Sequence, residues 1–269
     1  MDARGLGRLR EKCLAADAEE GRADLRSASG PGAGAFLLPP EDASDIMEDT
    51  QFRVASRLRL HVPRAGALGL SSPSLHCNHR ASSDGTICGE ALDSSNSHQL
   101  KCKIGGLVTE RHDRLRDWLA ALLRRVLGPG AGVTTEQYVL AWDRVGDDGK
   151  VEHARLDVTY VVGGRRVYLD VAVVTARSAD VPTQRAQGAR DGAAADREED
   201  SKRRRYPGPD LRPFVVEALG RLGGDATALL RELAPAEPAA RSLFIRRAQR
   251  ELSVHLQSST AELLLRAEQ

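Results

Sequence analysis

Two aspartates stand in adjacent apolar runs, at positions where a strand of a buried sheet would normally carry Val, Ile or Leu. Asp157 and Asp170 lie in the segment 155–174, RLDVTYVVGGRRVYLDVAVV, on either side of Gly163 and Gly164. A Gly-Gly pair favours a two-residue hairpin turn, because both central residues of such a turn take positive φ. The segment therefore predicts an antiparallel hairpin with one carboxylate on each strand.

The turn also fixes the register of the predicted hairpin. If Val162 pairs with Arg165, Asp157 lies directly opposite Asp170, and both side chains point to the same face. Directly opposed Cβ atoms are about 4.5–5.5 Å apart, so two ionised carboxylates repel unless one is protonated or a cation binds between them. A Mg²⁺ or Mn²⁺ ion there would activate water and neutralise phosphate charge, as phosphodiester cleavage requires. The other face, predicted to be the core side, carries Val158, Tyr160, Val162, Val167, Leu169 and Val171.

A competing interpretation places both aspartates on a solvent-exposed face without a chemical role. Two other residues favour chemistry. Glu136, on a strand predicted over 134–143, offers a third carboxylate. Lys202 is one of few lysines in an arginine-rich chain. A lysine, unlike an arginine, can shift its pKa, position a water molecule and contact a scissile phosphate.

Three cysteines and a histidine form a second candidate site. Cys77, Cys88, His98 and Cys102 have the spacing C-x10-C-x9-H-x3-C. Structural zinc takes four such ligands in a tetrahedron, which leaves no open position for chemistry. The first interval is wide for a compact knuckle, and His79 could compete with Cys77 as a ligand. The other interpretation is three buried thiols and a surface histidine.

Hydrophobic periodicity predicts a mixed α/β protein, with a small mixed sheet flanked by helices and with helical termini. The cysteine–histidine spacing adds a small zinc knuckle. From Gly106 the predicted order is helix, strand, strand, strand, helix, strand, helix. The predicted regions are a helical, low-complexity segment and linker (1–50), a linker with a short helix (51–75), the knuckle (76–106), the core (107–235) and a C-terminal amphipathic helix (236–269). Within them we predict helices at 45–60, 192–206, 225–234 and 239–268, a strand at 214–219 and a loop at 179–190.

Composition limits the classes of function. The net charge is +1, so affinity for nucleic acid must come from local patches, and 4% aromatic residues argue against a base-stacking platform. The sequence contains no run of about 18 apolar residues, so we expect no membrane span. The N-terminus lacks the apolar core of a signal peptide. We therefore expect an intracellular protein with reduced thiols, including a lone Cys13.

The acids and the lysine resemble a known nuclease pattern. Glu136, Asp157, Asp170 and a displaced Lys202 are similar to the PD-(D/E)XK nuclease superfamily, in which the lysine usually lies two residues after the second acid; that position is Ala172 here. The knuckle, the RHD sequence on the helix after Gly106, and the lysine of KRRRY followed by tyrosine resemble the restriction-like endonuclease of site-specific non-LTR retrotransposons. The likeness covers about residues 75–235. Leu156 replaces that family's proline, and nothing resembles a reverse transcriptase.

This resemblance implies a Mg²⁺- or Mn²⁺-dependent DNA endonuclease that nicks a target strand in the nucleus, with DNA as its partner and element RNA as a further candidate. In it Asp157 and Asp170 hold the metal, Glu136 assists, and Lys202 positions water or phosphate. The implied nucleic-acid contacts are Arg203, Arg204, Arg205 and Arg111, together with the zinc knuckle. KRRRY could instead be a nuclear localisation signal or a solvated helix end, and His112 either a catalytic group or a polar helix residue near the site.

Two other functions fit the same sequence. One is a catalytically inactive retrotransposon remnant that acts as a zinc-dependent nucleic-acid-binding protein; in it, divalent metal would not bind the acids. The other is a generic α/β interaction module in which no zinc binds and Cys77 has no special role. Glu217, which is flanked by apolar residues, is expected to have a structural role.

Overall fold

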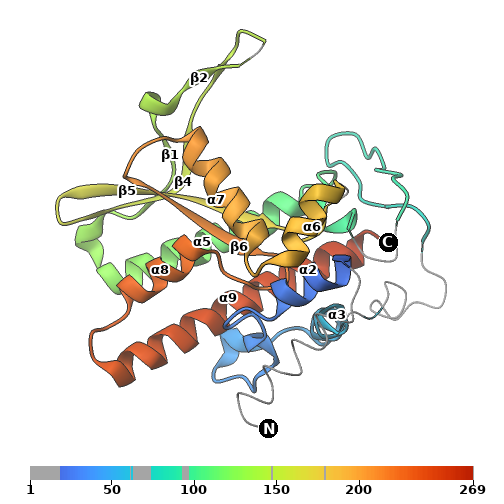
Figure 1. The fold of residues 1–269 in the computed structure, drawn as a ribbon, viewed down its shortest axis with the longest axis horizontal. Helices are drawn as coiled ribbons and strands as arrows, with labels where there is room; N and C mark the ends of the chain where they lie inside the picture. The colour runs from blue at the N-terminus through green and yellow to red at the C-terminus, as the bar shows by residue number, and fades with distance from the viewer. Residues whose placement is uncertain are drawn as a thin grey trace.

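The computed structural model describes residues 19–60, 62, 74–92, 97–146, 148–178 and 180–268. Cys13 and the part of the N-terminal helix predicted before residue 19 lie outside these residues. Within them the protein is mixed α/β, as predicted, with a four-stranded sheet, a two-stranded sheet and flanking helices (Figure 1).

The main sheet has the strand order β1-β4-β5-β6. Its strands are β1 (Thr134–Tyr138), β4 (Arg155–Val162), β5 (Arg165–Val174) and β6 (Leu211–Glu217). β4 is antiparallel to both of its neighbours, β1 and β5, whereas β6 runs parallel to β5. A parallel neighbour requires a long crossover, and the helices between β5 and β6 provide it.

The predicted hairpin register is confirmed. Val162 pairs with Arg165, and the ladder continues to Val158 and Leu169. Gly163 and Gly164 have φ of 57° and 75°, as a turn with two left-handed residues requires.

One face of the sheet packs on three helices, α5 (Leu107–Leu127), α8 (Gly224–Leu233) and α9 (Pro238–Arg266). This face is the main core and includes five of the six predicted residues of β4 and β5, together with Phe214 and Val216 of β6. The sixth, Val162, lies next to the turn and is exposed. The apolar stripe of α5 fits this arrangement, because residues three and four apart share a helix face. The prediction of a core side for the hairpin is therefore confirmed.

The opposite face of the sheet is covered by α7 (Ala193–Arg205). This helix is polar along most of its length and contacts the sheet through small residues: Ala195 packs with Ala172 of β5 and Val215 of β6. Small side chains allow the helix to approach closely, so its longer residues can reach over the strands. Beside α7 lies α6 (Val181–Ala189), which also contacts α2 (Glu19–Ala28) (Figure 1).

The N-terminal region is packed rather than linker-like where the structure describes it. Phe36 of a short 3-10 helix, Ala35–Leu37, is buried with Val254 of α9 and Ala55 of α3 (Asp49–Arg59). Gly220 follows β6 with φ of 107°, and a Cβ there would lie 2.8 Å from the carbonyl oxygen of Ala33. This close approach requires glycine.

Two local predictions differ from the structure. The segment 179–190 is not a loop: α6 forms there, with Asp180 as N-cap and proline in its first turn, and its buried side is polar (Gln184 and Gln187), so apolar periodicity gave no signal. The strand predicted at 134–143 ends at Tyr138 and continues as a 3-10 turn, Leu140–Trp142. A small hairpin of β2 (Arg144–Val145) and β3 (Val151–Glu152) then projects from the body (Figure 1).

The C-terminal helix is part of the core. Its middle lies in the main cluster through Leu252 and Leu256, and its end lies in a second cluster with Leu58 of α3. The predicted C-terminal helix therefore packs within the protein. No helix in the described ranges combines the length and the apolar character that crossing a bilayer needs.

Candidate functional site

The two aspartates meet beneath α7, where β4 separates from β5. Asp170 is only 5% exposed, so the interpretation of two solvent-exposed acids is wrong. The β4–β5 pairing ends at Val158 and Leu169. Just beyond it, the backbone N–H of Val171 donates to Asp157 Oδ2 at 2.6 Å. The carboxylate of Asp157 therefore accepts a hydrogen bond from a backbone amide of β5, which holds it next to Asp170.

The pKa values of this acid pair, Asp157 and Asp170, move apart. Burial raises the pKa of Asp170 to about 7; Lys202 opposes this, and Asp157 adds to it. Burial also acts to raise the pKa of Asp157, but the hydrogen bond and charge of His112 and the Val171 amide outweigh it and lower the pKa. A side-chain hydrogen bond between the two carboxyl groups contributes to both shifts. One acid thus favours its proton while the other is ionised, which relieves the like-charge repulsion.

Lys202 reaches this pair from α7. Its Nζ lies 3.0 Å from Asp170 Oδ2 and 3.8 Å from Glu198 Oε1. Burial acts to lower the pKa of Lys202, but the neighbouring carboxylates, Asp170 first, raise it above its ordinary value. Tyr206, at the end of the same helix, is buried nearby, and its pKa is raised by burial and by Asp170. The sequence-predicted lysine and the second acid are therefore brought into contact.

Glu217 fixes the start of the helix that carries Lys202. Its buried carboxylate accepts the backbone N–H of Ala195, in the first turn of α7, at 3.3 Å. Such an N–H has no partner within its own helix. The expected structural role of Glu217 is consistent with this contact.

His112 of α5 completes the site from the other side of the acid pair. Its Nε2 lies 3.2 Å from Asp157 Oδ2, and its Nδ1 lies 3.1 Å from Asp113 Oδ1. The hydrogen bond to Asp157 raises the pKa of His112 to about 9, against the opposing effect of burial. His112 is therefore protonated near neutral pH and places a positive charge beside Asp157. Sequence reasoning noted His112 but gave no signal for this contact, since it joins residues 45 positions apart.

Glu136 does not join the acid pair in this structure. It lies at the β1 position opposite Asp157 and has φ of 61°, a left-handed conformation that is rare for a residue other than glycine. Its carboxylate forms ion pairs with Arg116 of α5 and Arg155 of β4. Among the described residues, the acids around Asp157 form no group of three potential metal ligands. The prediction of a third carboxylate ligand is not met here.

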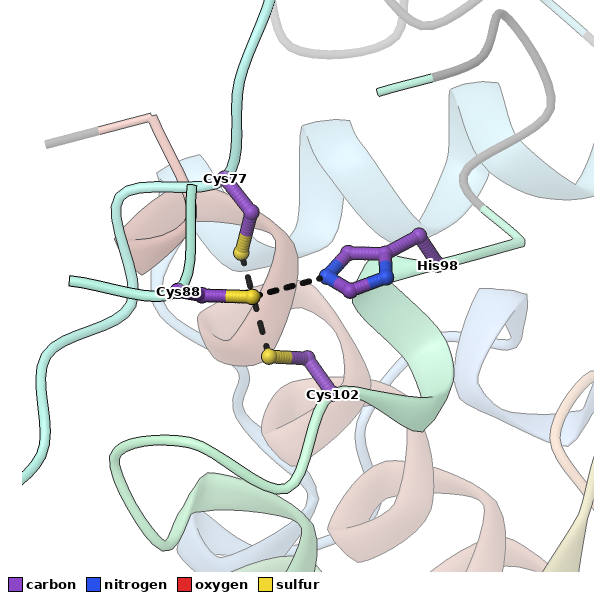
Figure 2. Close-up of side chains that lie close together, drawn as sticks. All are labelled: Cys77, Cys88, His98 and Cys102. Atoms are coloured by element: carbon purple, nitrogen blue, oxygen red, sulfur yellow. Dashed lines mark hydrogen bonds between the residues drawn. The ribbon is translucent and has the colours of Figure 1, made fainter. Parts of the chain in front are cut away.

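The cysteine–histidine set forms the second site. The ligand atoms of Cys77, Cys88, His98 and Cys102 all lie within 4.8 Å of one another, and Figure 2 shows them pointing to a common centre. The sulfurs of Cys77 and Cys102 are 3.8 Å apart, and Cys88 Sγ is 3.4 Å from His98 Nε2. Tetrahedral zinc with bonds of about 2.3 Å to sulfur and 2.0–2.1 Å to nitrogen requires separations of about 3.8 Å and 3.5 Å. The cluster could therefore hold a metal such as zinc.

The chemistry of the thiols agrees with this geometry. Burial raises the pKa of Cys77, and raises the pKa of Cys102 to about 12. Two buried thiols that do not ionise alone become good ligands when a cation compensates the thiolate charge. His79 is not a competitor of Cys77, because its Nε2 contacts the carbonyl oxygen of Leu263 at 2.9 Å.

The knuckle is attached to the helical layer of the core. His79 contacts α9 as described, and the backbone N–H of Asn78 donates to the carbonyl of Ala267 at 2.9 Å. Arg111 of α5 donates to the carbonyl of Leu100, between His98 and Cys102, at 3.0 Å. The knuckle thus packs on both α5 and α9.

The predicted DNA-contacting arginines have different environments. Arg111 is 2% exposed, so the prediction that it binds DNA is wrong for this conformation. Arg203 forms ion pairs with Asp200 and Asp225. The guanidinium of Arg205 lies 5.3 Å from the centre of the Tyr206 ring. Arg204 is exposed and lines a pocket described below.

Comparison with known proteins gives no family for this chain. The sequence matches no known protein family and no curated protein. Its function therefore has to be inferred from the acid pair and the cysteine–histidine cluster themselves.

Proposed function

We propose that this protein is a Mg²⁺- or Mn²⁺-dependent DNA endonuclease that hydrolyses phosphodiester bonds at the acid pair. The observation that carries the proposal is the contact of the buried Asp170 with the partly buried Asp157 and with Lys202, whose Nζ lies 3.0 Å from Asp170. Burial of two acids and a lysine opposes folding unless their charges compensate, and such costly clusters are frequent at functional sites.

The donor set fits a divalent cation. Asp157 and Asp170 would hold it, and it would supply an activated water and neutralise charge on the phosphate. Both carboxylates must be ionised to bind it, so the proton that Asp170 favours below about pH 7 has to leave. We therefore expect metal binding and activity to rise as the pH passes through about 7.

The residues around the acids have separable roles in this proposal. Lys202, held on α7 above Asp170, would donate a hydrogen bond to the attacking water or to a phosphate oxygen. His112 holds Asp157 in position and adds positive charge beside it. The cysteine–histidine cluster has four protein ligands, so its metal would fix the knuckle and take no part in the reaction. Glu136, paired with two arginines, has no direct role unless those ion pairs open.

The biological setting follows from the resemblance alone and is part of the proposal. It is the nicking of a DNA target strand, in the nucleus, by a protein derived from a retrotransposon. DNA is the expected substrate, and element RNA is a further candidate partner.

A plasmid-nicking assay tests the chemistry. Supercoiled plasmid with Mg²⁺ should be converted to the open circular form by the wild-type protein but not by Asp170→Asn or Lys202→Ala. Asp148→Asn is a matched control, because Asp148 is an exposed aspartate that pairs with Lys150 in the β2–β3 turn, away from the acid pair. Equal nicking by the wild type and Asp170→Asn would refute the proposal.

A second function is favoured by one observation. His112 and Lys202 already place a cationic side chain against each acid, so the site is electrostatically compensated without a divalent ion. A zinc-dependent nucleic-acid-binding protein without catalytic activity would fit this arrangement. Such a protein would bind DNA and zinc but would nick no plasmid with any divalent metal. Its DNA affinity would be the same in Asp157→Asn as in the wild type.

A further inference from the structure

A basic groove runs between α6 and α7 and reaches the knuckle. It is a pocket of about 410 Å³ with four cationic side chains in its lining, Lys101, Arg177, Arg197 and Arg204. Glu198 is the one carboxylate among its described lining residues. A second pocket of about 470 Å³ continues along α6 and α7 and shares Arg197 and Arg204 with the first.

Three parts of the chain contribute cations to this basic groove. Arg197, Ser201 and Arg204 lie four and three residues apart on α7, so they share one helix face. Arg177 follows β5 and forms an ion pair with Asp24 of α2. Lys101 comes from the knuckle, and its Nζ donates to the Arg177 carbonyl oxygen at 2.7 Å. The knuckle and the sheet domain thus build the groove together.

The lining of the groove is polar and hydrogen-bonding. Arg197 is held by a 2.8 Å hydrogen bond from its Nη1 to Thr183 Oγ1, and the amide of Gln187 lies in both pockets. The groove has few apolar contacts to offer a lipid or an apolar peptide. Clustered guanidinium groups with neighbouring hydroxyls and amides match the oxygens of phosphate groups.

The basic groove is connected to the acid pair. Glu198 lines the groove, and its Oε1 is 3.8 Å from the Nζ of Lys202, which contacts Asp170. Thr175, which also lines the groove, lies five residues beyond Asp170 in the chain, or about 16 Å along an extended strand. A nucleic-acid strand in the groove would therefore pass the acid pair within a few nucleotides.

We infer that this basic groove binds the sugar–phosphate backbone of the DNA substrate, a few nucleotides from the bond that the acid pair cleaves. The inference rests on the proposed function for the meaning of the acid pair, but the binding itself does not require cleavage. Arg197 and Arg204 contact phosphates from α7, and Lys101 contacts them from the knuckle. The metal-fixed knuckle then has a direct part in substrate binding, because it places Lys101.

The test is a binding titration without Mg²⁺, so that cleavage does not enter. Zinc-loaded protein is titrated into a short fluorescein-labelled DNA duplex, and anisotropy is followed between about 50 and 200 mM salt. The variant Lys101→Ala/Arg204→Ala removes two groove cations. Arg231→Ala/Arg246→Ala removes two exposed cations from α8 and α9, on the other face of the sheet, and is the matched control.

Two lost phosphate contacts should make the slope of log affinity against log salt less steep by about 1.8 for this duplex. The affinity of the groove variant should fall about tenfold or more at the lower salt concentration, as expected for two charge contacts near the surface. The control variant should keep both the slope and the affinity of the wild type. Equal losses in the two double variants, or wild-type binding by the groove variant, would overturn the inference.

The same proteins separate this inference from the nuclease proposal. Groove-dependent binding by a protein that nicks no plasmid would leave the groove assignment standing and remove the nuclease activity. Unchanged nicking by Lys101→Ala/Arg204→Ala would leave the nuclease proposal standing and remove the groove assignment. A single substitution, Arg204→Glu, should weaken binding more than Arg204→Ala, because it adds repulsion to the loss of a contact.

Discussion

Replacing Asp170 by asparagine should stabilise the metal-free fold at alkaline pH while it abolishes nicking. The pKa of Asp170 is raised from 3.8 to about 7, chiefly by burial. The folded state therefore holds a proton that the unfolded state releases between these values, and the wild type loses stability as the pH rises through this window. Above about pH 7 no further loss occurs.

The size of the effect follows from the shift. About three pKa units correspond to about 4 kcal/mol, and about 2–3 kcal/mol of this falls between pH 5 and pH 8. The asparagine of the variant does not titrate, so it would have no such pH dependence. Lys202 partly offsets the gain, because it loses its contact with the charged Asp170 and keeps Glu198, at 3.8 Å, and the charge of Asp157 as its neighbours in the variant. We therefore take about 2 kcal/mol as the expected relative stabilisation at pH 8 over pH 5.

Chemical denaturation of the zinc-loaded proteins without Mg²⁺ measures this difference. The free energy of unfolding of Asp170→Asn relative to the wild type should increase from pH 5 to pH 8. Adding Mg²⁺ at pH 8 should then stabilise the wild type and leave the variant unchanged, because binding to the folded state alone adds stability. A variant destabilised equally at both pH values would refute the argument from burial.

Three further predictions concern other parts of the chain. Cys102→Ser should lower zinc content, measured by elemental analysis, and should lower the melting temperature, since the knuckle packs on α5 and α9; an unchanged melting temperature and metal content would exclude the zinc site. In Glu199→Gln, a loss of stability of up to about 3 kcal/mol that the wild type shows between about pH 4.5 and 7 should be absent, because burial raises the pKa of Glu199 to about 7. Urea denaturation at pH 5 and pH 8 measures the free energy of unfolding of both proteins, and an equal change with pH in the two would contradict the prediction. Arg111→Met should lower DNA affinity less than Lys101→Ala/Arg204→Ala in the anisotropy assay, because Arg111 is buried and acts only through its hydrogen bond to the Leu100 carbonyl, next to Lys101; a loss larger than that of the groove variant would show that Arg111 itself reaches DNA.

Local signals in the sequence predicted much of the fold. The Gly163-Gly164 turn was enough for the hairpin register, because a two-residue turn leaves no choice of pairing. Apolar periodicity predicted α5, whose stripe packs on the sheet. It failed for α6, whose buried side chains are glutamines, and for the extent of β1, which ends where the chain turns at Leu140.

The candidate sites were predictable to the extent that they depend on neighbouring strands. The opposition of Asp157 and Asp170 follows from the hairpin, and the cysteine–histidine spacing pointed to one cluster. The contact of His112 with Asp157 depends on how α5 crosses the sheet, and the diversion of Glu136 depends on Arg116 of the same helix. Such packing between distant segments leaves no pattern in a single sequence.

The helix α9 joins regions that would otherwise be separate. Its middle lies under the sheet, and its last turns hold the knuckle through Leu263 and Ala267 (Figure 1). With 29 residues it is about 43 Å long. Because one continuous helix contacts both the sheet and the knuckle, fraying of its last turn should weaken both sets of contacts. Deleting the final residues of the chain should therefore destabilise the knuckle, as metal removal would, and also the packing under the sheet that carries the acid pair.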